Sequence, residues 1–381
     1  MLQLVAMSLN NSAYLDNMDM NYSNEIQLLI STVNKEIVDL NIIREHSNPP
    51  TQASSEFLTN KEQGDWAEQT LMKAINEQSI HYHAVKYGRG DDCVAGDPGF
   101  ADFYESYQNE LDEIGKRPDL LIFERGVIDQ SIVDISKMPR DYLDSIVPKA
   151  KCGIEVRSSA FLINKYDKYM ADKVAKATKN VFDIKETILG HHSDLLKRKD
   201  RALFDIISNI SGENIHVVEY RSPSWRSTPE LSELSSLLKE MKHNLKEIQK
   251  RDFLSITPKI EDLKVVYNWI QKYNVPHYYV QVFFDRAYGI SYKNILELLN
   301  DEAQEGGVYF IESDVKNQNK TTIKIRANYG KMVLSRVELP SHYSVMKELA
   351  RGRLLFYVKF RDSLAAVSKD ELNTLVGFDL I

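Results

Sequence analysis

Three short apolar segments set the strongest limit on the fold of this chain. In residues 117–126, RPDLLIFERG, four consecutive apolar residues lie between Pro118 and Gly126, a pattern typical of a strand buried on both faces. Residues 152–159 (CGIEVRSS) and 276–285 (PHYYVQVFFD) predict two further core strands. Strands that alternate with helices predict an α/β or α+β fold with a mixed central sheet flanked by helices. We expect the main helices at 60–78, 161–182 and 229–252.

The sequence also indicates where the chain divides. With 381 residues it can form one large elaborated domain or two domains. Residues 1–60 show weak periodicity and contain a Pro-Pro pair, which favours an N-terminal extension of helix and loop. We expect a core at 61–290 that carries a helical insertion at about 185–252, and a C-terminal α/β extension at 291–381 packed on this core. A shorter strand is expected at 214–220 (NIHVVEY).

The composition argues against several classes of protein. No apolar run approaches the ~20 residues that a membrane helix needs, and the N-terminus lacks the basic segment of a secretory signal. The two cysteines, Cys93 and Cys152, form no CxxC pair, which argues against structural zinc or a disulfide scaffold and favours a reducing cytoplasm. The net charge of −7 argues against a bulk non-specific nucleic-acid binder, but it leaves room for a focused basic cleft.

Glu155 and Arg157 form the most informative pair of polar residues. They lie two apart on an expected core strand, so both side chains point to the same face, and Val156 points to the other. An ion pair near a sheet edge explains this arrangement, and so does an active site. Asp119 begins another expected strand, and the sequence PD (118–119) followed by EVR (155–157) is similar to the PD…(D/E)xK signature of metal-dependent nucleases.

Phosphodiester hydrolysis gives a physical reason for these residues to meet. The reaction uses a hard cation to polarise the phosphoryl group and to activate water, and Mg²⁺ prefers oxygen ligands. The expected ligands are the carboxylates of Asp119 and Glu155 and the backbone carbonyl of Val156. Arg157 is the expected cation that steadies negative charge. The spacing of 36 residues between the two carboxylates is long for the signature and requires an insertion.

Five segments are informative in combination: GDWAE, RPDLLIF, GIEVRSSAFL, SITPKIEDL and VPHYYVQVFFD. Together they resemble the AccI-type family of type II restriction endonucleases, over roughly residues 60–290. The resemblance implies a Mg²⁺-dependent homodimer that cuts both strands of a short palindromic site in double-stranded DNA, with a companion DNA methyltransferase in the host. It also implies that Asp119, Glu155 and Arg157 are catalytic. Arginine stands where lysine is usual, and because it stays charged it cannot serve as a general base.

Other residues are candidates for supporting roles. Glu68, on the expected helix 60–78, and Lys259, after an expected strand, could support the active site, although the sequence around Lys259 also suits a helix cap. Four lysines of the 229–252 helix form one stripe that could follow a phosphate backbone or could simply face solvent. The candidate DNA-binding residues are Ser158, Ser159, Arg221, Arg226, Lys239, Lys242, Lys246 and Lys250.

Two other functions remain open at this point. One is a structure-specific or repair nuclease with the same core but another substrate. The other is a catalytically inactive DNA-binding module, which Arg157 in place of lysine would permit. The paired histidines His191 and His192 superficially suggest a His–Asn–His nuclease, but the segment lacks the cysteine pairs and the hairpin composition that such domains often carry.

Overall fold

The computed structural model describes residues 21–381 except 36, 38, 40–45, 47, 91–92 and 315–319, so residues 1–20 of the expected N-terminal extension, and part of 36–47, lie outside the described residues. The chain forms two compact units. We call residues 162–254 the insertion unit and the remainder, residues 1–161 and 255–381, the core unit. Each unit is described below by itself.

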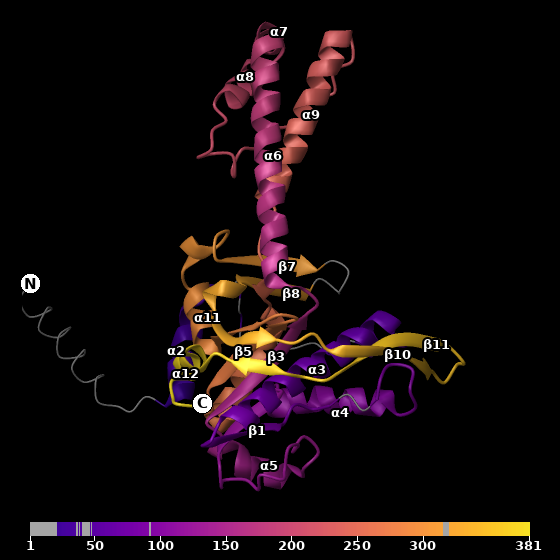
Figure 1. The fold of residues 1–381 in the computed structure, drawn as a ribbon, viewed down its shortest axis with the longest axis vertical. Helices are drawn as coiled ribbons and strands as arrows, with labels where there is room; N and C mark the ends of the chain where they lie inside the picture. Colours follow the sequence, from indigo (N-terminus) through magenta and orange to yellow (C-terminus); the bar gives the residue numbers. More distant parts are fainter. Residues whose placement is uncertain are drawn as a thin grey trace, which may run out of the picture. The chain divides into compact units, whose positions relative to one another are not determined.

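The core unit contains a mixed sheet flanked by helices, so the expected fold class is confirmed (Figure 1). Its strand order among the described residues is β1-β2-β3-β5-β6-β9-β12. β3 and β5 are parallel, and the other neighbouring strands of this sheet are antiparallel. The strands are β1 (Tyr82–Lys86), β2 (Leu120–Glu124), β3 (Cys152–Ser159), β5 (His277–Phe283), β6 (Ala287–Ser291), β9 (Lys331–Val337) and β12 (Ala365–Val367).

Side chains alternate between two faces of the sheet, and each face is covered by helices. Ile154 and Val156 of β3 lie in the core beneath α3 (Ser55–Gln78) and α12 (Lys369–Val376). Tyr279 of β5 lies in the opposite core. Since Glu155 pairs with Tyr279 in the parallel register, Glu155 and Arg157 point to this second face. Its helices are α2 (Tyr22–Thr32), α5 (Arg140–Ile146), α10 (Ile260–Tyr273) and α11 (Tyr292–Leu299).

Smaller elements complete the core unit. A ribbon of β10 (Ser341–Glu348) and β11 (Leu354–Arg361) packs on α3, where Leu355 and Leu58 share a small apolar core. A further sheet has the order β4-β8-β7. The remaining elements are α4 (Phe100–Glu113), β4 (Ser255–Ile256), β7 (Tyr309–Asp314), β8 (Lys320–Arg326), and the 3₁₀ turns η1 (Val147–Lys149), η2 (Glu302–Gln304) and η4 (Ala327–Tyr329).

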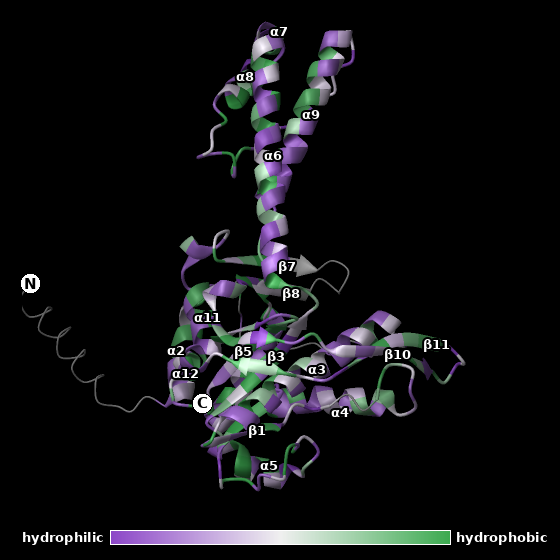
Figure 2. Cartoon of the chain, viewed as in Figure 1, coloured by the Kyte–Doolittle hydropathy of each residue, from purple (hydrophilic) through white to green (hydrophobic). Residues whose placement is uncertain are grey.

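The insertion unit is helical because its apolar residues recur at intervals of three and four. It consists of α6 (Ile163–His191), α7 (Ser193–Lys199), α8 (Arg201–Ser208) and α9 (Pro229–Gln249). Along α6 and α9, hydrophobic positions alternate with hydrophilic ones (Figure 2). Leu231, near the start of α9, is buried, and the residues of α9 that pack with α6 in one core are Leu234, Leu238, Met241, Leu245 and Ile248.

The prediction of a strand at 214–220 is wrong. These residues form turns and irregular structure, because no neighbouring strand is present to accept their backbone hydrogen bonds. Asn214 Oδ1 instead accepts from the backbone N–H of Ser211 at 2.8 Å, which closes a turn. Ile215 is buried in the helical core, whereas Val217 is 77% exposed. The apolar residues of this segment therefore cover helices and do not form a sheet.

No helix within the described parts of the chain is both long enough and apolar enough to cross a membrane.

Candidate active site

The register of two antiparallel strands brings Asp119 and Glu155 together. Leu120 of β2 pairs with Ile154 of β3, so the next position along places Asp119 opposite Glu155. Asp119 Oδ2 also accepts a hydrogen bond of 2.7 Å from the backbone N–H of Val156. The two carboxylates thus come from adjacent strands, at the point where β2 begins.

Glu155 and Asp262 each hold the same two cations. Glu155 is 2% exposed, and its Oε1 lies 2.6 Å from Lys116 Nζ and 2.8 Å from Arg157 Nη2. Asp262 Oδ2, on α10, lies 2.9 Å from Lys116 Nζ and 3.1 Å from Arg157 Nη2. Two carboxylates and two cations therefore alternate around one small buried cluster. Glu155 Oε2 is buried and has no hydrogen-bond partner among the described residues.

The electrostatic environment separates Glu155 from Asp119. Burial disfavours the charged form of Glu155, but Lys116 and Arg157 outweigh it and hold the pKa of this carboxyl below its ordinary value. In Asp119, burial together with repulsion from Glu155 and Glu68 raises the pKa well above its ordinary value. Asp119 is therefore the carboxylate whose negative charge is least compensated by the protein. A cation bound beside it would supply that compensation.

Glu68 of α3 is a third carboxyl group close to the Asp119–Glu155 pair. Burial is the main reason that its pKa is raised, and repulsion from Asp65 and Glu155 contributes. Its Oε2 is 3.2 Å from Lys86 Nζ, which offsets part of this cost. The charge of Glu68 also contributes to the raised pKa of Asp119.

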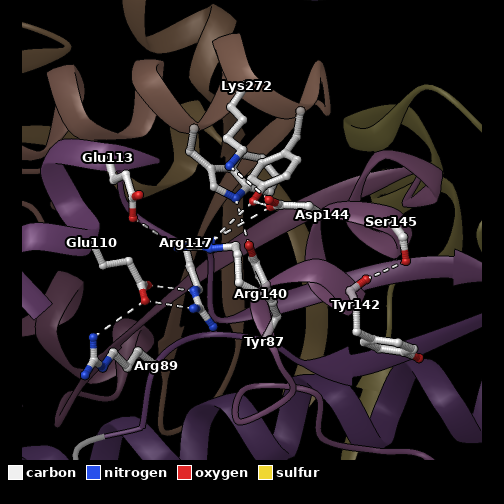
Figure 3. Close-up of polar contacts among 12 residues, drawn as sticks. Tyr87, Arg89, Glu110, Glu113, Arg117, Arg140, Tyr142, Asp144, Ser145 and Lys272 are labelled. Atoms are coloured by element: carbon white, nitrogen blue, oxygen red, sulfur yellow. Dashed lines mark hydrogen bonds and ion pairs between the residues drawn. The ribbon is translucent and has the colours of Figure 1, made fainter. Parts of the chain in front are cut away.

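The segment 116–119 is also fixed by a second ion-pair network, formed by Arg117, Glu110 and Arg89 (Figure 3). Arg117 Nη2 donates to Glu110 Oε2 at 2.8 Å, and the Arg117 guanidinium lies 5.2 Å from the centre of the Tyr87 ring. Arg89 contacts the same Glu110 oxygen at 3.5 Å. Because Arg117 follows Lys116 directly and precedes Asp119 by two residues, this network limits the movement of the whole segment.

Gly88 allows β1 to approach Asp119 closely. The backbone N–H groups of Tyr87 and Gly88 both donate to the Asp119 carbonyl, at 2.8 and 3.0 Å. A Cβ atom at position 88 would lie 2.9 Å from Asp119 Cα, closer than real Cβ atoms come, and 3.0 Å from Asp119 Oδ1, which is also a very tight contact. A side chain here would displace the carboxylate.

Lys259 occupies a helix-capping position, as one reading of its sequence suggested. It is the N-cap residue of α10 and forms a bridge with Thr322. Its charge helps to lower the pKa of Asp262. Ser158 and Ser159 lie at the end of β3, where they pair with Val282 and Phe283 of β5.

The basic candidates of the insertion unit fall into separate groups. Arg221, Lys242 and Lys246 line one groove, which also includes Tyr220. Lys250 is bound to Glu247 instead. Arg226 and Lys239 are exposed and do not line this groove.

Lys116 and Asp262 are the two members of the cluster that the sequence did not reveal. Lys116 stands three residues before Asp119, outside the signature. Asp262 lies within SITPKIEDL, one of the family-like segments, but nothing in that segment indicates a contact with Glu155. The signal for Asp262 was its place in the first turn of an expected helix, where an acidic residue ordinarily has a capping role.

The donors at this site fit a hard divalent cation. Among the described residues Glu155 Oε2 is buried without a hydrogen-bond partner, and burial with the neighbouring carboxylates raises the pKa of Asp119, so a cation beside Asp119 would stabilise its charged form. Mg²⁺ commonly takes one or two carboxylates and keeps several waters. Among the described residues no three His, Cys, Asp or Glu side chains form a ready metal cluster. Two carboxylates and the Val156 carbonyl would therefore make up the protein's share of the ligands.

Adjacent carboxylates beside fixed cations are the groups that phosphodiester hydrolysis uses, so the fold and the site favour a nuclease. The chain belongs to the AccI restriction endonuclease family, whose model matches residues 20–380. It is accordingly a restriction endonuclease, a hydrolase that acts on double-stranded DNA. No curated protein and no solved structure matches the chain.

Proposed function

We propose that the chain is a type II endonuclease that uses Mg²⁺ to hydrolyse both strands of a short palindromic DNA site. The main support is the Asp119–Glu155 pair: Glu155 Oε2 is buried with no hydrogen-bond partner in the described part of the chain, and the Asp119 carboxyl has a raised pKa. The proposal includes a cytoplasmic homodimer and a companion methyltransferase that protects the host's copies of the site.

Asp119, Glu155 and the Val156 carbonyl would hold the metal. When bound, Mg²⁺ polarises the phosphoryl group and makes the attacking water more acidic. The protein holds these donors in place through the strand pairing and through the hydrogen bond from the Val156 N–H to Asp119. Glu68 keeps a further negative charge close by, which favours cation binding.

Lys116 and Arg157 would bind the scissile phosphate. Burial and Arg157 both favour the neutral amine of Lys116, but Asp262 and Glu155 reverse this and raise its pKa above the ordinary value. Lys116 is therefore charged at neutral pH, and neither cation acts as a general base. Both can donate charge-assisted hydrogen bonds to the negative charge that develops on the phosphate. Asp262 is a positioning residue that holds both cations.

Cleavage of a supercoiled plasmid with Mg²⁺ tests this function. We expect discrete bands that persist at saturating enzyme. A smear would mean non-specific or structure-driven cutting, and no cutting with a retained gel shift would mean an inactive binding module.

Substitutions test the assignment of the metal ligands. Asp119→Ala and Glu155→Ala should each abolish cleavage and retain DNA binding in EDTA, because both would remove a metal ligand and reduce repulsion with phosphate. Glu105→Ala, which removes an exposed carboxylate of α4, serves as the control and should cut normally. Cleavage above a few per cent of wild type in either ligand variant would remove that residue from the site.

A further inference from the structure

The insertion unit contains a groove of about 540 Å³ between α9 and the segment 218–221. Tyr220 and Arg221 line one side, and Lys242 and Lys246 of α9 line the other. Lys242 and Lys246 are one helical turn apart, about 6 Å along the axis. Three cations thus face a single groove, which also includes one acidic residue, Glu219.

The three cations are available to a ligand. Within the described residues, Arg221, Lys242 and Lys246 have no carboxylate within 4.0 Å. Other lysines of this unit are ion-paired: Lys173 and Lys250 both bind Glu247. An ion-paired lysine must give up its partner before it can bind an anion. Arg221, Lys242 and Lys246 can bind an anion without first breaking an ion pair of this kind.

The groove is held in shape by contacts across it. The Tyr220 hydroxyl donates to the backbone carbonyl of Leu238 at 2.6 Å, and its ring centre lies 6.0 Å from Lys242 Nζ. Gln249 Nε2 donates to the Val218 carbonyl at 2.8 Å. These bonds attach the irregular segment to α9, so ligand binding would require little ordering of the backbone.

The charge of the insertion unit favours an anionic ligand. Its residues include 17 Lys and Arg against 14 Asp and Glu, a net charge of +3, in a chain whose net charge is −7. We propose that this groove binds the phosphate backbone of duplex DNA through Arg221, Lys242 and Lys246, without regard to base sequence. The inference rests on the proposed function, because it supplies a second contact with the same DNA.

The test measures how salt affects binding of the full-length protein to a random-sequence 30-base-pair duplex in EDTA. The triple variant Arg221→Ala/Lys242→Ala/Lys246→Ala should lower the slope of log affinity against log salt by up to about 2.7, since each phosphate contact contributes roughly 0.9. Between 50 and 200 mM salt, the wild-type affinity should therefore fall up to about 40-fold more than that of the variant. The control Lys176→Ala/Lys199→Ala/Lys239→Ala removes three exposed lysines of the same unit and should keep most of the wild-type slope.

Lysine acetylation of the wild-type protein gives a readout that needs no variant. DNA should protect Lys242 and Lys246 from acetylation but leave Lys239, on the same helix, reactive. Equal slopes for the two triple variants, or equal reactivity of Lys242 with and without DNA, would overturn the groove assignment. Plasmid cleavage by the wild type, measured in parallel, separates the outcomes. If the enzyme cuts and the two slopes are equal, the groove assignment alone is refuted. If the enzyme shows no cutting and no binding, the proposed function and the groove assignment are both refuted.

Discussion

Lys116 and Arg157 contact the same carboxylate oxygens, although they come from different parts of the chain. Arg157 lies on β3 beside Glu155, and Lys116 lies before β2. An arginine on β3 and a lysine from the neighbouring segment thus reach the same carboxylate. This arrangement gives the site one compact and one planar cation, with different hydrogen-bonding geometry.

Lys116→Met should lower single-turnover cleavage by about 10²–10³, the usual cost of losing one donor to a transition-state charge. Methionine keeps the apolar stem but leaves Glu155 and Asp262 to share Arg157, so the melting temperature should fall, and cleavage should be measured well below it. Arg157→Ala should show a loss of similar size, and Arg157→Lys should recover much of it. The control Lys151→Ala breaks an exposed ion pair with Glu124 and should leave the rate unchanged. Wild-type cleavage by folded Lys116→Met would exclude Lys116 from catalysis.

Asp119→Asn should raise the melting temperature at pH 7.5 in EDTA. The pKa of Asp119 is higher in the folded protein than in the unfolded chain, so its contribution to stability is fully present below the unfolded pKa and is lost as pH rises through the folded pKa. Asparagine removes the buried charge and can still accept from the Val156 N–H. The stabilisation should therefore shrink as the pH is lowered towards 5, and Mg²⁺ should stabilise the wild type but not the variant.

Asp129→Asn is the matched control for this measurement. Asp129 is exposed, and its pKa is lowered by hydrogen bonds from Ser131, so its replacement should give no gain in stability at pH 7.5. If Asp119→Asn melts at or below the wild-type temperature across this pH range, the buried charge of Asp119 is already compensated and the metal assignment loses its support.

At the scale of residues, the sequence predicts the contacts that form within one pair of neighbouring strands. Asp119, Glu155 and Arg157 resemble the two halves of a bipartite signature, and they lie on or next to the neighbouring strands β2 and β3. Lys116 and Asp262 could not be inferred, because their contact joins residues 146 positions apart. Such a contact depends on how α10 lies across the sheet, and local sequence does not encode that.

At the scale of elements, the approach of β1 to β2 sets the position of Asp119. Apolar patterns predicted the core strands and the long helices, because their side chains repeat with the period of the element. The segment 214–220 was wrongly predicted as a strand for the same reason. Its apolar residues alternate, but those that are buried pack against helices. Gly88 has no such signal, since the need for glycine there arises from a neighbouring strand.

Gly88→Ala should reduce cleavage strongly while the protein remains folded. The added methyl group would press on both the backbone and the carboxylate of Asp119. Gly90→Ala, two residues along, is the matched control, because nothing lies within 4 Å of a Cβ at that position. Cleavage rates and melting temperatures of the two variants should be compared. Equal activity would show that Asp119 tolerates displacement and does not require this close approach.

At the scale of the whole molecule, the number of active sites matters. The described core unit carries one Asp119–Glu155 site, and a palindromic duplex has two equivalent strands. We expect a two-fold dimer, with one site for each strand, because a two-fold DNA sequence is matched by a two-fold protein. Light scattering of the complex with cognate DNA should give twice the chain mass plus the mass of the duplex. A single chain bound to a cleaved site would contradict this expectation.

The parallel pairing of β3 with β5 has a consequence for how the enzyme is made. The chain leaves the sheet after Ser159 and returns to it at His277, and the whole insertion unit lies in between. Closing so long a loop costs conformational entropy, which the separate helical core reduces if it forms first. A ribosome that has made residues 1–159 has produced Asp119 and Glu155, but neither Asp262 nor β5, the strand that pairs in parallel with β3. A prematurely terminated chain of this kind therefore lacks the complete charge cluster, and we expect it to leave the DNA of its host uncut.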